Sequence, residues 1–148
     1  MSGDKLIIDK IKNGVVIDHI KAGQGVRIFD WLSLGKSAHT IAFVVNAVSP
    51  QMGRKDIIKI YDTININYDI LGLIDPNIKV SIIENEIITQ KITLQLPERV
   101  ENVLFCKNPR CITSTEKYIP HIFHIADREA EIYRCEYCDE TRGAEDFR

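Results

Sequence analysis

The stretch CKNPRCITSTEKYIPHIFHIADREAEIYRCEYC, residues 106–138, places four cysteines in two close pairs. Cys106 and Cys111 are separated by four residues, Cys135 and Cys138 by two, and 23 residues lie between the pairs. Zinc favours four tetrahedral ligands, and a close pair of cysteines on a tight turn can present two thiolates to one ion. Four thiolates leave no coordination position open, so the pattern predicts one structural zinc ion per chain.

Other interpretations of these cysteines are two disulfides, four unconnected thiols or a redox-active CxxC pair. All four cysteines lie in the last third of the chain. In a reducing compartment such a cluster is more typical of a metal site than of disulfides. A redox role for Cys135 and Cys138 lacks the βαβ context that such a motif needs. His121 and His124 are alternative ligands, but with four cysteines at hand we interpret both as ordinary strand residues.

The segment around the cysteines is predicted to be a separate, small domain. LPERVENV, residues 96–103, is predicted to be a hinge, and the formal charge changes from +1 over residues 1–99 to −3 over residues 100–148. The piece beyond the hinge is too short to be stabilised by an apolar core alone, whereas a metal ion would stabilise it. We therefore predict two domains, residues 1–98 and residues 99–148.

The first domain alternates short β-like runs with two helical patterns, which predicts an α+β fold. We expect a ferredoxin-like α/β sandwich, with an antiparallel sheet and two helices on one face, followed by a small all-β zinc-binding domain. Phe29 and Trp31 are interpreted as core residues of the first helix. The expected strands are Leu6–Ile8, Gly14–Ile20, Thr40–Val48, Asp56–Tyr61, Lys79–Ile83 and Ile87–Leu96, and the expected helices are Gly25–Leu34 and Asn67–Ile74.

Composition and motifs exclude several classes of function. The net charge of −2 is not that of a typical nucleic-acid-binding protein, which carries a basic surplus to neutralise phosphates. No apolar run approaches the roughly 20 residues needed to span a membrane. The opening MSGDKLIIDKIKNG lacks the features of a signal peptide, so we expect a cytoplasmic protein. Neither GxxxxGK[ST] nor GxGxxG occurs, and no carboxylates form a recognisable acid–base pair, so we expect no enzymatic activity.

Four motifs in order resemble one known family. They are NGVVIDHI (13–20), MGRKDIIKI (52–60), LPERVENVLFC (96–106) and the cysteine spacing itself. Together they are similar to the regulatory chain of bacterial and archaeal aspartate carbamoyltransferase. The resemblance implies a non-catalytic subunit of pyrimidine biosynthesis whose N-terminal domain binds the effectors CTP, UTP and ATP. It also implies pairing of two regulatory chains and contact between the zinc domain and the catalytic chain, with paired regulatory chains bridging catalytic trimers.

The resemblance also implies a set of nucleotide-binding residues, drawn from separate strands of the first domain. Two positions, Ser81 and Glu86, depart from the family's pattern. The implied nucleotide-binding residues are Asp9, Ile11, Val16, Asp18, His19, Lys59, Ile83, Ile88 and Lys91.

The chemistry of these residues suits a triphosphate. Lys59, Lys91 and His19 can supply positive charge to phosphates, and Asp18 can accept hydrogen bonds from ribose hydroxyls. Without the resemblance, these residues are better interpreted as solvated surface residues, and we keep that interpretation for Arg54 and Lys55.

Three other functions stay open. They are a zinc-ribbon protein that binds nucleic acid, a small zinc-dependent enzyme, and a purely structural assembly subunit. If nucleotide does bind, we expect it to act by shifting the population between two quaternary states.

Overall fold

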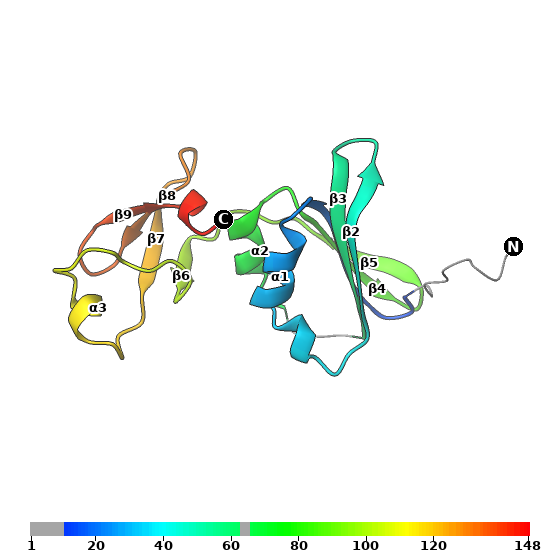
Figure 1. Ribbon diagram of the computed structural model, residues 1–148, viewed down its shortest axis with the longest axis horizontal. Helices are drawn as coiled ribbons and strands as arrows, with labels where there is room; N and C mark the ends of the chain where they lie inside the picture. The colour runs from blue at the N-terminus through cyan, green and yellow to red at the C-terminus, as the bar shows by residue number, and fades with distance from the viewer. Residues whose placement is uncertain (1–10, 63–65) are drawn as a thin grey trace, which may run out of the picture. The chain divides into compact units, whose positions relative to one another are not determined.

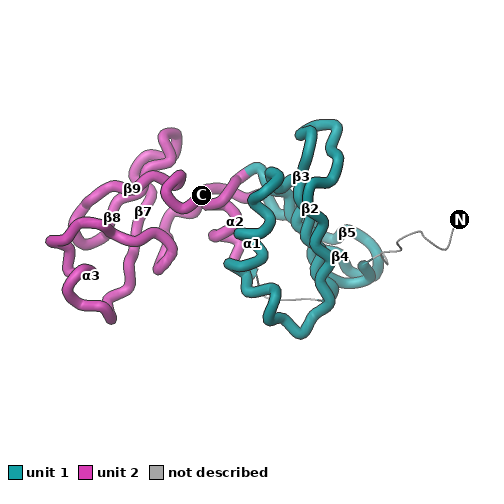
Figure 2. The backbone as a smooth tube through the Cα atoms, in the orientation of Figure 1, with its two compact units in different colours: residues 1–66, 77–93 teal, residues 67–76, 94–148 magenta. Residues whose placement is uncertain are grey.

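The computed structural model describes residues 11–62 and 66–148 of the chain. These residues form two compact units (Figure 2). The first contains the described part of residues 1–66 together with residues 77–93, and the second contains residues 67–76 and 94–148. The predicted strand Leu6–Ile8 lies outside the described residues. No helix in the described ranges is both long and apolar enough to cross a membrane.

The first unit is built on a five-stranded antiparallel sheet (Figure 1). Its strand order is β2-β3-β1-β4-β5, so the first strand in the sequence lies in the centre of the sheet. Among the described strands, β2 and β5 are the two edges of the sheet. The bounds are β1 Gly14–Lys21, β2 Ile41–Ser49, β3 Gly53–Tyr61, β4 Lys79–Glu84 and β5 Ile87–Ile92.

One face of this sheet is apolar and buried. Alternate residues of a strand point to opposite faces, and Val15 and Ile17 of β1 are 3% and 0% exposed. Ile58 and Ile60 of β3 pair with them in register and are fully buried as well. The helix α1, Gly25–Trp31, packs against β3.

The helix α1 is shorter than predicted. We expected Gly25–Leu34, but the helix ends at Trp31 because Ser33 adopts a left-handed conformation with φ 53°. A short 3-10 helix, η2 (Leu34–Lys36), follows. Phe29 stacks on Phe43 with ring centroids 5.5 Å apart, in keeping with a core role. Trp31 retains 37% exposure and is therefore not the core residue we expected.

The second unit combines one helix with a four-stranded antiparallel sheet of order β6-β7-β8-β9. The helix α2, Tyr68–Ile74, begins after Asn67, whose side chain accepts a hydrogen bond from the amide of Asp69 at 3.1 Å. Such a cap satisfies one of the amides that a helix start leaves without a partner. The other elements are β6 Arg99–Glu101, α3 Ile112–Thr115, β7 Ile122–Asp127, β8 Ile132–Cys135, β9 Thr141–Gly143 and the 3-10 helix η3 Ala144–Asp146.

These elements confirm the predicted α+β class: an antiparallel sheet with helices, followed by a small all-β sheet. The predicted hinge at residues 96–103 is wrong in part. Arg99–Glu101 forms β6, which pairs with β7 and so belongs to the second sheet. Three residues with one buried side chain, Val100, carry too little apolar alternation to be recognised as a strand.

Candidate metal centre and effector face

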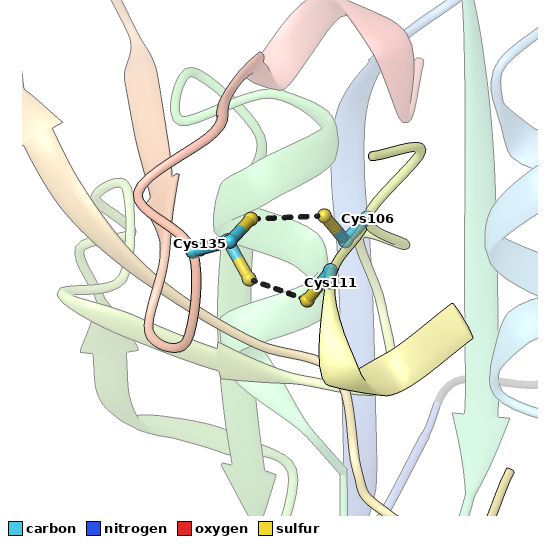
Figure 3. A group of neighbouring side chains, drawn as sticks. Cys106, Cys111 and Cys135 are labelled. Atoms are coloured by element: carbon cyan, nitrogen blue, oxygen red, sulfur yellow. Dashed lines mark hydrogen bonds between the residues drawn. The ribbon is translucent and has the colours of Figure 1, made fainter. Parts of the chain in front are cut away.

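The four cysteines converge from two loops of the second unit. Cys106 and Cys111 flank the turn before α3, Cys135 ends β8, and Cys138 lies in the turn beyond it. Their sulfur atoms all lie within 4.8 Å of one another. Figure 3 shows the sulfurs of Cys106, Cys111 and Cys135 pointing toward a common centre. The structure thus brings together all four ligands that the spacing predicted.

The spacing of the sulfurs fits a tetrahedral metal ion and not a disulfide. Zinc–sulfur bonds of about 2.3 Å in a tetrahedron place the sulfurs about 3.8 Å apart. The sulfur of Cys106 lies 3.5 Å from that of Cys138, and the sulfur of Cys111 lies 3.8 Å from that of Cys135. A disulfide needs about 2.05 Å, and all four cysteines are free. Because four thiolates complete the coordination, the centre is structural.

Neighbouring groups hold the cysteines in place. The hydroxyl of Thr113, which is 1% exposed, donates a hydrogen bond to the sulfur of Cys111 at 3.1 Å. The amide of Cys106 donates to Nδ1 of His121 at 3.0 Å. Burial and the nearby charge of Lys117 lower the pKa of His121, so the ring is neutral and able to accept this bond. His121 therefore supports the loop from outside the cysteine group.

The other candidate histidine also lies apart from the cysteines. His124 is on β7, and its Nε2 is 2.9 Å from a carboxylate oxygen of Glu136. Within the described residues, the group that could hold a metal contains the four cysteines alone.

Three of the four thiols have shifted pKa values: burial raises the pKa of Cys135, and the shifts of Cys106 and Cys111 are larger. Burial raises the pKa of the Cys106 thiol to about 12. Burial alone would raise the pKa of Cys111 too, but hydrogen bonds from the Thr113 hydroxyl and amide lower it to about 7. The two loops thus offer thiols of unlike acidity, and a bound cation would stabilise the thiolate form of each.

A second constellation lies on the open face of the first sheet, opposite its buried face. Val16 on β1 pairs with Lys59 on β3 and with Ser81 on β4, and Ser81 pairs with Lys91 on β5. Residues directly opposite each other in antiparallel strands point to the same face. Lys59, Val16, Ser81 and Lys91 therefore form one row across four strands, which we call the effector row.

Asp18 and His19 stand beside this row, at a bulge in β1. The ladder between β1 and β3 shifts register between Ile17 and Ile20, and His19 has φ 59°. The amide of His19 donates to the Asp18 carboxylate at 2.6 Å. Nε2 of His19 lies 3.0 Å from the side-chain oxygen of Gln51, in the turn between β2 and β3. The bulge thereby directs the imidazole of His19 toward the neighbouring turn.

Lys55 belongs to this group, although the sequence pattern did not indicate it. Its Nζ lies 3.0 Å from the Asp18 carboxylate, and the side chain is 18% exposed. A lysine with this partner is not the freely solvated turn residue that we expected. The signal was available, because Lys55 and Lys59 are four residues apart on one strand and so share a face.

The remaining predicted effector residues that the structure describes are apolar. Ile83 on β4 pairs with Ile88 on β5, and Ile88 is 51% exposed. Ile11 precedes β1 and is 6% exposed. Asp9 lies outside the described residues.

Fold and sites together define a class of protein: a two-part chain in which an antiparallel sheet with one open face is joined to a four-cysteine metal-binding unit. Residues 6–95 match the family described as aspartate carbamoyltransferase regulatory chain, allosteric domain. Residues 98–148 match the metal binding domain of the same chain. The chain therefore belongs to the aspartate carbamoyltransferase regulatory-chain family, and it is a regulatory, non-catalytic subunit.

Individual relatives agree along almost the whole length. The aspartate carbamoyltransferase regulatory chain of Clostridium botulinum strain Hall is 52% identical over 142 residues, covering 96% of this chain and 97% of the relative. That of Clostridium tetani is 53% identical over 136 residues, covering 91% and 94%. That of Bifidobacterium longum is 38% identical over 133 residues, covering 90% and 96%.

Proposed function

We propose that this chain binds nucleoside triphosphates, namely CTP, UTP and ATP, on the open face of its first sheet and so regulates aspartate carbamoyltransferase in pyrimidine biosynthesis. The observation that carries the proposal is the effector row. Two lysines stand on one open face, separated by two β-strands, with a carboxylate and a histidine beside them. A flat, polar face that carries cations on separate strands suits an extended anion.

Each part of the nucleotide has a candidate partner on this face. Lys59, Lys91 and His19 offer positive charge or hydrogen-bond donors to the triphosphate, and Asp18 offers acceptors to the ribose. Lys55 orients the Asp18 carboxylate, with its Nζ 3.0 Å away. Ile83 and Ile88 supply apolar contact area. The proposed nucleotide-binding set is Asp9, Ile11, Val16, Asp18, His19, Lys59, Ile83, Ile88 and Lys91.

The metal in the cysteine centre is proposed to be zinc, one ion per chain. Four thiolates in tetrahedral spacing suit Zn²⁺, although iron also binds such sites. The unit that holds it is proposed to contact the catalytic chain. We propose domain limits of 1–98 and 99–148, as the spans of the two family matches support, and a cytoplasmic location.

Two such chains are proposed to pair through the first unit. The edge strand β2 exposes Val45 by 51% and Val48 by 74%. An edge strand with unpaired backbone groups and exposed apolar side chains is suited to pairing with a second chain. This supports a regulatory-chain homodimer.

Calorimetric titration of the purified chain with CTP and with ATP tests the proposal, with metal content measured on the same sample. We expect saturable binding of at least one nucleotide and one zinc per chain. The chain is then assembled with its catalytic partner, and activity is followed with and without each nucleotide. A chain that assembles but neither binds nor responds to any of the three nucleotides would instead be a structural subunit.

A further inference from the structure

The second compact unit, residues 67–76 and 94–148, holds the four cysteines and is called here the metal-bearing unit. The helix α2 is held within it by close backbone contact. A Cβ atom added at Gly72, in the middle of α2, would lie 2.2 Å from the carbonyl oxygen of Gln95. The helix and the segment that leads into β6 therefore approach each other as closely as two backbones can. No side chain larger than hydrogen fits at Gly72 without separating them.

Arg148 ties the same helix to the β7–β8 hairpin. Its Nε donates to the carbonyl of Leu73 at 3.1 Å, and its two terminal nitrogens donate to Glu131 at 2.7 and 3.2 Å. Leu73 lies in the last turn of α2, where carbonyls have no amide partner within the helix. A guanidinium held by both oxygens of a carboxylate has a fixed orientation.

The segment after Thr93 is tied to the same hairpin. Arg128 donates to the carbonyl of Leu96 at 2.6 Å. The hydroxyl of Tyr133, a fully buried residue, donates to the carbonyl of Pro97 at 2.6 Å. Three side chains thus bind three backbone carbonyls, one in α2 and two in the segment that leads into β6.

We infer that α2 moves together with the metal-bearing unit, and that Arg148 is the positioning residue that couples them. The chain reaches α2 from β3 and leaves it for β4, and these two strands carry Lys59 and Ser81 of the effector row. The connection from α2 to β4, residues 75–78, is short, so a displacement of β4 is passed along the chain to α2. A helix fixed to the metal-bearing unit transmits that displacement instead of absorbing it.

The mechanical part of this inference is tested without any nucleotide, by hydrogen exchange on the full-length chain with its metal bound and after chelation. Loss of metal should speed amide exchange in α2 together with that in β7 and β8, and leave β1 and β3 unchanged. If α2 keeps its protection while β7 and β8 lose theirs, α2 is not held by the metal-bearing unit and the inference is overturned.

The role of Arg148 is tested by substitution in the metal-loaded chain. Arg148→Met should speed exchange in α2 about tenfold or more, as expected for loss of a charge-assisted hydrogen bond. Arg148→Lys, which keeps the charge, should restore part of the protection. Arg134→Met, at an exposed position of the same hairpin, is the matched control and should leave α2 unchanged. Equal exchange in the Arg148→Met and Arg134→Met chains would overturn the inference.

The regulatory consequence rests on the proposed function and is measured in the assembled enzyme. Arg148→Met should reduce the change in activity caused by CTP or ATP at least threefold, with nucleotide affinity and metal content unchanged. An undiminished response in this variant overturns the coupling role. If the wild-type enzyme itself fails to respond, the proposed function fails, and the hydrogen-exchange results still decide whether Arg148 holds α2.

Discussion

At the scale of single residues, the lysines of the effector row are the most direct test of nucleotide binding. Lys91 is exposed on β5, at one end of the row. Lys91→Ala should weaken triphosphate binding about tenfold, because one charge-assisted contact contributes about 1.5 kcal/mol or more. Calorimetric titration measures the change in Kd. Lys36→Ala, an exposed lysine on η2 away from the row, should leave Kd unaltered.

Thr113 should matter more to metal retention than its small side chain suggests. Its buried hydroxyl donates to the sulfur of Cys111. Groups that hydrogen-bond to metal ligands typically change metal affinity 10- to 100-fold, so Thr113→Val should raise the metal Kd about tenfold. Competition with a chromophoric chelator measures this. Thr115→Val on the same helix removes an exposed hydroxyl that bonds only to the Ile112 carbonyl, and should have little effect.

The unlike acidities of Cys106 and Cys111 predict how metal binding depends on pH. The Cys106 thiol, with a pKa of about 12, is protonated throughout the neutral range and must release its proton to the solvent when metal binds. Cys111, with a pKa of about 7, releases a proton only in the fraction of chains that are still protonated. Affinity should therefore fall as pH falls, and more steeply below pH 7.

Calorimetry in buffers of different ionisation enthalpy counts the protons released when metal binds. The number should be larger at about pH 6 than at about pH 8, by up to about one proton for the Cys111 thiol. The same number at both pH values would contradict the assignment of a lowered pKa to Cys111.

At the scale of elements, Asp56 joins three segments of the first unit. This fully buried carboxylate on β3 accepts hydrogen bonds of 3.0 Å from the amides of Gly23, Gly25 and Asn46. The two glycines form the turn into α1, and Asn46 lies at the irregularity in β2. One carboxylate thus accepts hydrogen bonds from three amides that would otherwise lack an acceptor, because a turn and a bulge interrupt the backbone pairing there.

Removal of this carboxylate should destabilise the first unit strongly. Asp56→Ala leaves one buried and two part-buried amides without this acceptor, at a cost of about 3 kcal/mol. Urea unfolding followed by the fluorescence of Trp31, the single tryptophan, measures the free energy of unfolding of this unit. Asp62→Asn is the matched control, since Asp62 is 77% exposed, lies 3.9 Å from His39, and has a left-handed φ of 72° that asparagine also tolerates; it should change stability by less than about 0.5 kcal/mol.

The strands of the first sheet could be predicted from sequence because they alternate between a buried and an open face. Gly14–Ile20 was expected as a strand, and β1 spans Gly14–Lys21. The bulge at His19 could not be predicted, because Asp18-His19-Ile20 alternates like any strand and the cause of the bulge is tertiary. For the same reason the orientation of His19 toward Gln51 had to come from the structure, and so did the pairing of Lys55 with Asp18, although the spacing of Lys55 and Lys59 already gives their shared face.

The metal centre was predictable to a greater extent than the effector face. Two close pairs of cysteines in a short segment are typical of a metal site, and all four cysteines converge as expected. The effector residues are common types on exposed strands, so periodicity alone could not separate them from solvated residues. Periodicity predicts which residues of one strand share a face of the sheet. The row of Lys59, Val16, Ser81 and Lys91 also depends on the pairing register between strands, which only the structure supplies.

At the scale of the whole molecule, each of the two units is stabilised in a different way. The first has a conventional apolar core, in which Ile17, Ile20, Ile28, Ile58 and Ile60 are all fully buried. The four-stranded sheet of the second unit buries chiefly Phe123 and Tyr133, with strands of three to six residues. A sheet this small depends on a metal ion that joins its loops, because the free energy of metal binding adds to the free energy of folding.

Metal removal should therefore separate the unfolding of the two units. Calorimetric scanning of the metal-loaded chain and of the chelated chain should show that the transition of the metal-bearing unit is lost or shifted far down in temperature. The transition of the first unit should move little.

Trp31 lies in the first unit and Tyr133 in the second, so tryptophan fluorescence reports on the first unit while tyrosine near-UV circular dichroism reports mainly on the second. Loss of both signals together on chelation would mean that the metal stabilises the whole chain as one cooperative body. Retention of both would mean that the second sheet is stable without the ion, and four cysteines within 4.8 Å would then need a role other than folding.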